Sequence, residues 1–405
     1  MFEAFSERDY RRFWTAQFIS NIGSWMQAVA QGWLVYRLTD SAFLLGFVGF
    51  ASSAPAVLLM LPGGVIADQL DRKKVVAASQ IVQALTALSL AIAIRANAIS
   101  VWHIITAAVV VGIAQSFSAP AFQAMVVDLL ETRAHLPNAI AMNSLQFNTS
   151  RAIGPLIAGV TLSAWGSDWC FLINALSFLP LVWVLFRTHN RQQPLEGSAA
   201  MFERLSEGLR FVRADRVLLL FLALAAAASL FGYPSMTLMP VVARAMFADE
   251  AAGLGYLMGA TGAGALAGAL ALSVRTPSAR RAIPLIVGSL SIFGVSLGLV
   301  GMFRAPTMVL PLLFLCGVSM VVSMAMCNTS IQRRVPDALR GRVLSMYTFA
   351  FFAFIPFGNL AAGLVAERSG IRAALMMLGA GLMVSAVAGA AAARAGGRVG
   401  VAGSW

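Results

Sequence analysis

The sequence contains few charged residues, few histidines and few cysteines, and each shortage excludes a class of protein. Only 11% of the 405 residues are charged, compared with about 25% in an average soluble domain. The three cysteines are an odd number within apolar stretches, which argues against a disulfide framework. The three histidines are scattered, and no Gly-Lys-Ser/Thr phosphate loop is present. The sequence therefore predicts no metal centre, no cofactor, no ATP motor and no enzyme.

Apolar residues make up 59% of the chain and gather in long runs. A helix that crosses a bilayer needs about 20 residues, so twelve crossings would use about 240 residues. We therefore predict an all-α polytopic membrane protein with twelve transmembrane helices. The apolar runs lie near residues 13–36, 42–67, 75–94, 101–127, 139–165, 170–186, 217–241, 253–274, 283–303, 307–330, 343–366 and 373–393.

One long polar stretch divides these runs into two sets of six. We predict a first helical bundle over residues 1–187, a cytoplasmic linker over 188–215 and a second bundle over 216–405. Apolar residues recur at helical spacing within the linker. They predict an amphipathic helix at the inner membrane surface, although an ordinary solvated linker helix would show the same pattern. The positions are Phe202, Leu205, Leu209 and Val212.

Lys and Arg are concentrated at the ends of alternate apolar runs. The formal net charge is +12, but the basic residues form no single patch or tail, so no nucleic-acid partner is predicted. If the chain starts inside, most basic residues fall on cytoplasmic segments, as the positive-inside rule requires. We therefore predict two cytoplasmic termini, and a first run that is a retained span and not a cleaved signal peptide.

Arg151 is a cation deep within a predicted span. It lies about twelve residues, or roughly 18 Å, from either end of the run, which is too far for comfortable snorkelling. Its insertion costs on the order of 3 kcal/mol, so the side chain should face a wet cavity or backbone carbonyls. Substrate binding or gating is one interpretation, which would suit an anionic substrate, and a structural tie is the other.

Further polar residues in the spans predict a substrate path. On the first span they recur at roughly helical spacing, which places them toward an interior path or in hydrogen bonds between helices. Isolated amides on other spans would join the same cavity. The predicted path consists of Gln17, Asn21, Trp25, Gln31, Gln115, Asn148, Arg151 and Asn328.

Residues 64–74 read GVIADQLDRKK, which is a glycine, small and apolar residues, an aspartate and a basic cluster. This segment resembles the signature loop of the major facilitator superfamily, although Gln69 and Asp71 stand where Arg and Gly are usual. SNIGSWMQ at 20–27, GWLVY at 32–36 and APA at 119–121 are similar to segments of the branch that includes enterobactin-type and macrolide exporters. The resemblance extends over the whole chain.

The resemblance implies two pseudo-symmetric six-helix bundles that expose a central path alternately to the two sides of the membrane. It also implies that Asp68 latches the outward-open state by meeting the start of span 11, near Arg340 and Arg342. Gly64 would let two helices approach closely. The alternative is that Asp68 and Arg72 are simply loop charges that set topology.

Two further motifs acquire roles from the resemblance. Arg72 would form an ion pair with Asp128 at the end of span 4. Gly154 and Pro155 resemble part of the antiporter motif of drug exporters, without its full set of glycines. Physically, Gly-Pro predicts a bend or a tight packing contact; the functional alternative is a stiff seal against ion leak.

The function predicted from these features is secondary active export of a small organic molecule, drug-like or a siderophore, across the bacterial inner membrane. Protons are the expected coupling ion and a monomer the expected state. However, none of the 17 acidic residues lies deep in a span, and proton antiporters usually need a buried titrating carboxylate. Coupling through Asp68, Asp128 and Arg151 is one hypothesis. The alternative is a passive facilitator or a lipid or metabolite transporter without proton coupling.

Overall fold

The computed structural model describes residues 3–188, 209–274, 277–278 and 281–399. Within these ranges, side chains are not described at 60–69, 133, 337–338 and 395–399. Every element in the described part of the chain is helical. This agrees with the predicted all-α class.

The first six predicted apolar runs form six long helices. Each begins and ends within a few residues of a predicted apolar run, because charged and turn residues bound the runs. Short 3₁₀ turns, Glu3–Ser6 and Arg133–His135, precede the first and fifth helices. The helices are α1 (Arg8–Thr39), α2 (Ala42–Gln69), α3 (Arg72–Arg95), α4 (Val101–Asp128), α5 (Leu136–Trp165) and α6 (Ser167–Arg187).

The seventh predicted run, residues 217–241, forms several short helices in place of one continuous span. Proline at Pro234 and Pro240 begins a new short helix each time, since proline donates no backbone hydrogen bond. A π-helical turn, Ala228–Gly232, precedes the first of these breaks. The pieces are α8 (Arg216–Ala227), α9 (Pro234–Thr237) and α10 (Met239–Met246).

The remaining helices are α11 (Glu250–Val274), α12 (Ala282–Met302), α13 (Pro306–Arg334) and α14 (Asp337–Val399). α14 is two helices that meet at Gly370, whose φ of 84° and ψ of 162° are not helical. Glycine adopts this backbone conformation without strain. The predicted eleventh and twelfth runs lie on either side of this residue.

Nine stretches of the described chain are long and apolar enough to cross a membrane. α1 and α5 are not among them, because polar side chains such as Gln17 and Arg151 lower their hydropathy. One of the nine, Leu339–Arg394, has 56 residues and contains the Gly370 break. The exact number of crossings therefore stays a prediction.

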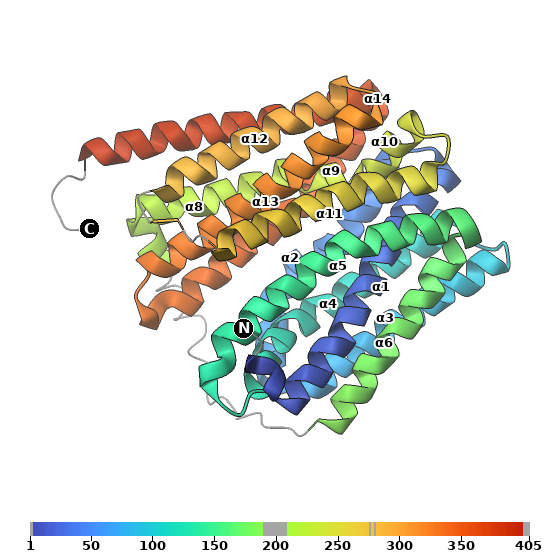
Figure 1. Cartoon of the computed structure of the whole chain (residues 1–405), viewed down its shortest axis with the longest axis horizontal. Helices are drawn as coiled ribbons and strands as arrows, with labels where there is room; N and C mark the ends of the chain where they lie inside the picture. Colours follow the sequence, from blue (N-terminus) through green and yellow to red (C-terminus); the bar gives the residue numbers. More distant parts are fainter. Residues whose placement is uncertain (1–2, 189–208, 275–276, 279–280, 400–405) are drawn as a thin grey trace.

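α1–α6 pack mainly against one another, and so do α8–α14. We call these groups the first half and the second half. Figure 1 shows the first half in blue to green and the second in yellow-green to red, with the two lying side by side. The most extensive contacts between the halves are made by two pairs of helices, α5 with α11 and α2 with α14. We call these two contacts between the halves the seams.

Glycine permits the close approach at both seams. A Cβ placed on Gly159 of α5 would lie 2.9 Å from the Cα of Gly255 on α11. On the other seam, a Cβ on Gly46 of α2 would lie 2.9 Å from the Cα of Gly363 on α14. Small residues bring backbones together in membrane helices, where lipid supplies no hydrophobic drive for association.

The predicted amphipathic linker helix lies mostly outside the described residues. Phe202 and Leu205 fall there, whereas residues 209–214 are helical. In this piece Val212 is buried and Leu209 is 40% exposed. The choice between a membrane-surface helix and a solvated helix stays open.

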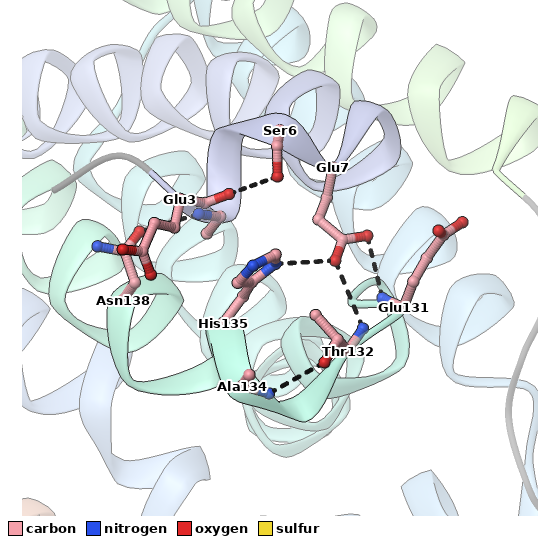
Figure 2. A network of polar contacts seen from close by, with 9 residues as sticks. Glu3, Ser6, Glu7, Glu131, Thr132, Ala134, His135 and Asn138 are labelled. Atoms are coloured by element: carbon pink, nitrogen blue, oxygen red, sulfur yellow. Dashed lines mark hydrogen bonds and ion pairs between the residues drawn. The ribbon is translucent and has the colours of Figure 1, made fainter.

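The beginning of the chain is tied to the connection between α4 and α5 (Figure 2). The carboxylate of Glu7 accepts hydrogen bonds from the backbone N–H of Glu131 at 3.0 Å and of Thr132 at 3.4 Å. It also contacts Nδ1 of His135 at 3.1 Å. The backbone N–H of Ala4 donates to Asn138 at 3.0 Å. These contacts hold α1, α4 and α5 together at the end where the chain begins.

Candidate functional site

Arg151 lies between the two halves and is only 4% exposed. Its Nη2 atom is 3.4 Å from the sulfur of Met236 on α9 and 3.5 Å from the sulfur of Met320 on α13. Its Cζ atom is 5.8 Å from the centroid of the Trp25 ring on α1. The guanidinium from the first half is therefore surrounded by side chains from both halves.

The surroundings of Arg151 compensate its charge poorly. A thioether sulfur is only a weak hydrogen-bond acceptor, and Nε of Arg151 has no hydrogen-bond partner among the described residues. Within the described part of the chain, no carboxylate forms an ion pair with it. A buried cation without a counter-ion is costly. An anion that reached this position would relieve that cost.

The neighbouring helices approach Arg151 through glycine and an aromatic side chain. A Cβ on Gly262 of α11 would lie 2.6 Å from the backbone oxygen of Arg151. On the other side, a Cβ on Gly154 would lie 2.5 Å from the Cβ of Trp25. The Trp25 ring meets Phe147 edge to face, with centroids 5.9 Å apart. The predicted packing role of Gly154 is thus confirmed, and the cation sits in an aromatic and thioether environment.

α5 continues through Pro155 as a single helix from Leu136 to Trp165. The carbonyl oxygen of Pro155 lies 3.1 Å from the position of a Cβ on Gly255. Pro155 is therefore at the α5–α11 seam. A sealing function for the Gly154-Pro155 pair is not tested by these contacts and stays a prediction.

On α1, the predicted polar stripe is partly visible. Gln17 donates from Nε2 to Oδ1 of Asn21 at 3.0 Å. Oε1 of Gln17 is buried and has no partner among the described residues. Gln31 is partly buried one turn beyond Gln27. Of the stripe, only Trp25 has a described contact with Arg151.

The isolated amides make their described contacts within their own halves. Gln115 donates to Gln83 of α3 at 3.2 Å. Asn148 donates to the backbone oxygen of Ser144 on its own helix at 2.8 Å. Asn328 accepts a hydrogen bond from Gln332, also on its own helix. A role for these three amides in a substrate path stays a prediction.

Three groups of residues were missed by the sequence analysis. Met236 and Met320 contact Arg151, but methionine in an apolar run carries no distinguishing signal. Gln80 and Gln83 of α3 are 7% and 6% exposed. Two glutamines three residues apart in an apolar run could have signalled this buried polar position. Asn359 of α14 is 3% exposed and accepts from Thr237 at 2.9 Å.

The predicted ion pair between Arg72 and Asp128 is present. Nη1 of Arg72 lies 2.9 Å from Oδ2 of Asp128, and the side chains are 11% and 23% exposed. Since both residues belong to the first half, this pair braces the ends of α3 and α4. It does not join the halves.

The contacts of Gly64 and the side chain of Asp68 lie outside the described part of the structure. Their contact with the start of span 11 is therefore untested. Arg340 and Arg342 lie in the first turns of α14, and each has an interaction partner. The latch that the resemblance implies for Asp68 stays a prediction.

Polar contacts join the halves at the end of the molecule that holds α10, which we call the α10 end. Nη1 of Arg244 on α10 lies 2.7 Å from Oδ1 of Asp40, just after α1. The hydroxyl of Ser163 on α5 donates to Asp249, which precedes α11. Glu367 of α14 accepts from the backbone N–H of Ala42 on α2 at 2.7 Å. The two halves are thus fastened together at the α10 end.

Solved structures with the same fold are transporters. One is a bacterial homologue of the human lysosomal transporter Spinster, in an inward-facing and unoccupied conformation. It superposes with a TM-score of 0.73 over 97% of this chain and 98% of its own, at 13% sequence identity. This likeness establishes the fold alone.

Several curated relatives match most of the chain, among them the following two. The staphyloferrin A transporter of Staphylococcus aureus is 26% identical and is aligned over 91% of this chain and 92% of its own length. The multidrug efflux pump Tap of Mycolicibacterium fortuitum is 24% identical over 90% of each. The family model described as a transmembrane secretion effector matches residues 1–395. The chain therefore belongs to the transmembrane secretion effector family of the major facilitator superfamily, and it is a multi-pass membrane transporter and not an enzyme.

Proposed function

We propose that this transporter exports a small organic molecule that carries an anionic group, a drug-like compound or a siderophore, by alternating access. The observation that carries the proposal is Arg151, a cation only 4% exposed, without a described carboxylate partner, between side chains of both halves. An anionic substrate would pair with the guanidinium by charge-assisted hydrogen bonds. The aromatic ring of Trp25 offers a surface for the apolar part of the same molecule.

The substrate class is supported by the relatives. One relative is named for the siderophore staphyloferrin A and another for multidrug efflux. Efflux by a relative supports the outward direction. Both substrate classes include molecules that combine a polar group with apolar surface, which fits the mixed environment of Arg151.

The proposed topology has twelve crossings in two bundles, over residues 1–187 and 216–405, with the linker at 188–215 and both termini in the cytoplasm. The nine apolar stretches support it, since one of them has 56 residues and breaks at Gly370. α1 and α5 would supply the remaining two crossings. The α10 end then faces outward from the bacterial inner membrane. We propose a monomer, because one chain contains both halves.

Proton coupling is part of the proposal. Coupling would run through Asp68 and Asp128, at the cytoplasmic ends of spans, and through Arg151. The alternative is a passive facilitator, or a lipid or metabolite transporter, without coupling. It is favoured by one observation: Arg151 has no described carboxylate within ion-pair distance that could titrate beside it.

The experiment is transport in proteoliposomes with an anionic compound and its neutral methyl ester, with and without an imposed pH gradient. The wild type should move the anion faster than the ester, and Arg151→Gln should remove this preference. Arg37→Gln is the matched control, because Arg37 also stacks on a tryptophan, Trp33 at 4.7 Å, but lies exposed at the end of α1. Equal rates for both compounds in wild type and Arg151→Gln would contradict the substrate assignment.

The same proteoliposomes test coupling and gating. A protonophore should abolish accumulation of the anion against its gradient, and accumulation that persists would favour the uncoupled alternative. Asp68→Asn should lower transport while the folded protein remains in the membrane. Unchanged transport in this variant would mean that Asp68 is only a topogenic charge.

A further inference from the structure

The carboxylate of Glu367 in the second half binds the first turn of α2 in the first half. Its Oε2 atom accepts from the backbone N–H of Ala42 at 2.7 Å and of Phe43 at 3.2 Å. It also accepts from the hydroxyl of Ser41 at 3.2 Å. One carboxylate oxygen thus receives three donors from the opposite half. Negative charge at this position is favourable, because the first N–H groups of a helix have no partner within it.

Three other helices of this protein take such a carboxylate cap from the residue just before them. Asp71 accepts from the N–H of Lys73 at the start of α3. Asp215 does the same for α8, and Asp249 for α11. α2 has only Ser41, which accepts from the N–H of Leu44 at 3.1 Å. The remaining donors of its first turn are satisfied by Glu367, so α2 takes the charged part of its cap from the other half.

The glycine crossing places Glu367 at this helix start. Gly46 and Gly363 are in contact where α2 and α14 cross. Glu367 lies four residues after Gly363, and Ala42 lies four residues before Gly46. Each is therefore about one helical turn from the crossing. A separation of the halves at this end would break the carboxylate contacts.

The other polar contacts at the α10 end are less suited to holding the two halves together. Arg244 and Asp40 are 43% and 67% exposed at their side chains, and exposed ion pairs contribute little. Asp249 already caps its own helix, and among the described residues of the first half the hydroxyl of Ser163 alone donates to it. Glu367 binds two fixed backbone donors of the opposite half, which lose no side-chain freedom on binding.

We propose that Glu367 is the latch that holds the α10 end closed, and that its release from the start of α2 accompanies opening at that end. A similar contact is predicted between Asp68 at the end of α2 and the start of α14. There the carboxylate belongs to the first half and the helix start to the second, whereas Glu367 belongs to the second half and binds a helix start in the first. The latch rests on the alternating access of the proposed function. It does not depend on the substrate that Arg151 binds.

The test is a distance measurement across the α10 end. Spin labels at Ala98→Cys and Ala305→Cys lie on exposed loops of the first and second halves. The native cysteines are buried and stay unlabelled. Electron–electron double resonance then gives the populations of closed and open α10 ends in detergent or nanodiscs, without substrate.

Glu367→Ala should raise the ratio of long to short distances about three- to tenfold, the range that charged capping of a helix start supplies. Glu367→Gln keeps an acceptor and should give a smaller rise, whereas Glu367→Lys should give a larger one. The matched control is Asp168→Asn. Its carboxylate pairs with Arg95 at 2.8 Å within the first half, so its loss should not change the ratio.

Distance distributions that stay at the wild-type shape in all three Glu367 variants would overturn the latch. So would an equal change in Asp168→Asn. If the wild-type distance responds to substrate while the variants resemble the wild type, alternating access stands and the latch is wrong. If neither substrate nor any variant changes the distance, the proposed alternation fails as well.

Discussion

Nη2 of Arg151 on α5 lies 3.5 Å from the sulfur of Met320 on α13, in the opposite half of the molecule. Charged guanidinium groups in protein interiors normally meet carboxylates or carbonyl oxygens. Here the nearest described acceptors are two methionine sulfurs. Such an arrangement lowers the stability of the substrate-free protein and leaves the binding capacity of the cation unused.

Arg151→Met should therefore separate stability from function. Removing an uncompensated charge should raise the unfolding free energy by on the order of 2–3 kcal/mol. Transport of an anionic substrate should fall about 10- to 100-fold, the effect of losing a hydrogen bond to a charged group. Thermal unfolding in detergent and uptake into proteoliposomes measure the two effects. A variant that is less stable and equally active would show that Arg151 is a structural tie.

Gly154→Ala should destabilise the first half. The added Cβ would lie 2.5 Å from the Cβ of Trp25, so α1 and α5 must move apart. Overpacking of this kind costs about 1–3 kcal/mol. The melting temperature of Gly154→Ala is compared with that of Gly288→Ala on α12, where an added Cβ meets nothing within 4 Å. Equal melting temperatures for the two variants would contradict the close crossing.

The ion pair between Arg72 and Asp128 should show thermodynamic coupling. Both side chains are largely buried, at 11% and 23% exposed, so each single variant, Arg72→Gln or Asp128→Asn, leaves a charge without its partner. The double variant should be more stable than the sum of the two single effects predicts, with a coupling of about 0.5–3 kcal/mol. Strict additivity in chemical unfolding would show that the pair carries no interaction energy.

The contacts of Glu7 should weaken in acid. Burial opposes its ionisation, but the backbone N–H of Glu131, the His135 ring and the N–H of Thr132 together outweigh it and hold the pKa of Glu7 below the usual 4.5. A carboxyl with a lowered pKa stabilises the fold above its unfolded value, and this stabilisation is lost as the pH falls through the folded value.

Hydrogen exchange at the amides of Glu131 and Thr132 measures this effect. After correction for intrinsic rates, protection should be constant at neutral pH and decrease below about 4.5. Glu7→Gln should show low protection throughout, because a neutral amide accepts these hydrogen bonds less strongly. Wild-type protection in Glu7→Gln at neutral pH would mean that the carboxylate is not what holds the α4–α5 connection.

The sequence predicted the helical class and the position of most helices, because hydropathy and bounding charges are local properties of the chain. It also identified Arg151, since a cation far from either end of an apolar run is unusual in any fold. Pro234 and Pro240 are plain in the sequence, but the helix ends beside them were not predicted from it. Whether a proline ends a membrane helix depends on the groups that satisfy the freed carbonyls.

Hydropathy and residue order are enough to specify a bundle of apolar helices with one deeply placed arginine. The contacts of that arginine with two methionines, and of Glu367 with the start of α2, appear only when the helices are packed together. Both contacts join residues from opposite halves, far apart in the chain. They depend on how the helices are rotated and aligned at the two seams, and the glycine crossings that set this alignment are specified by shape complementarity between helices and not by any local pattern.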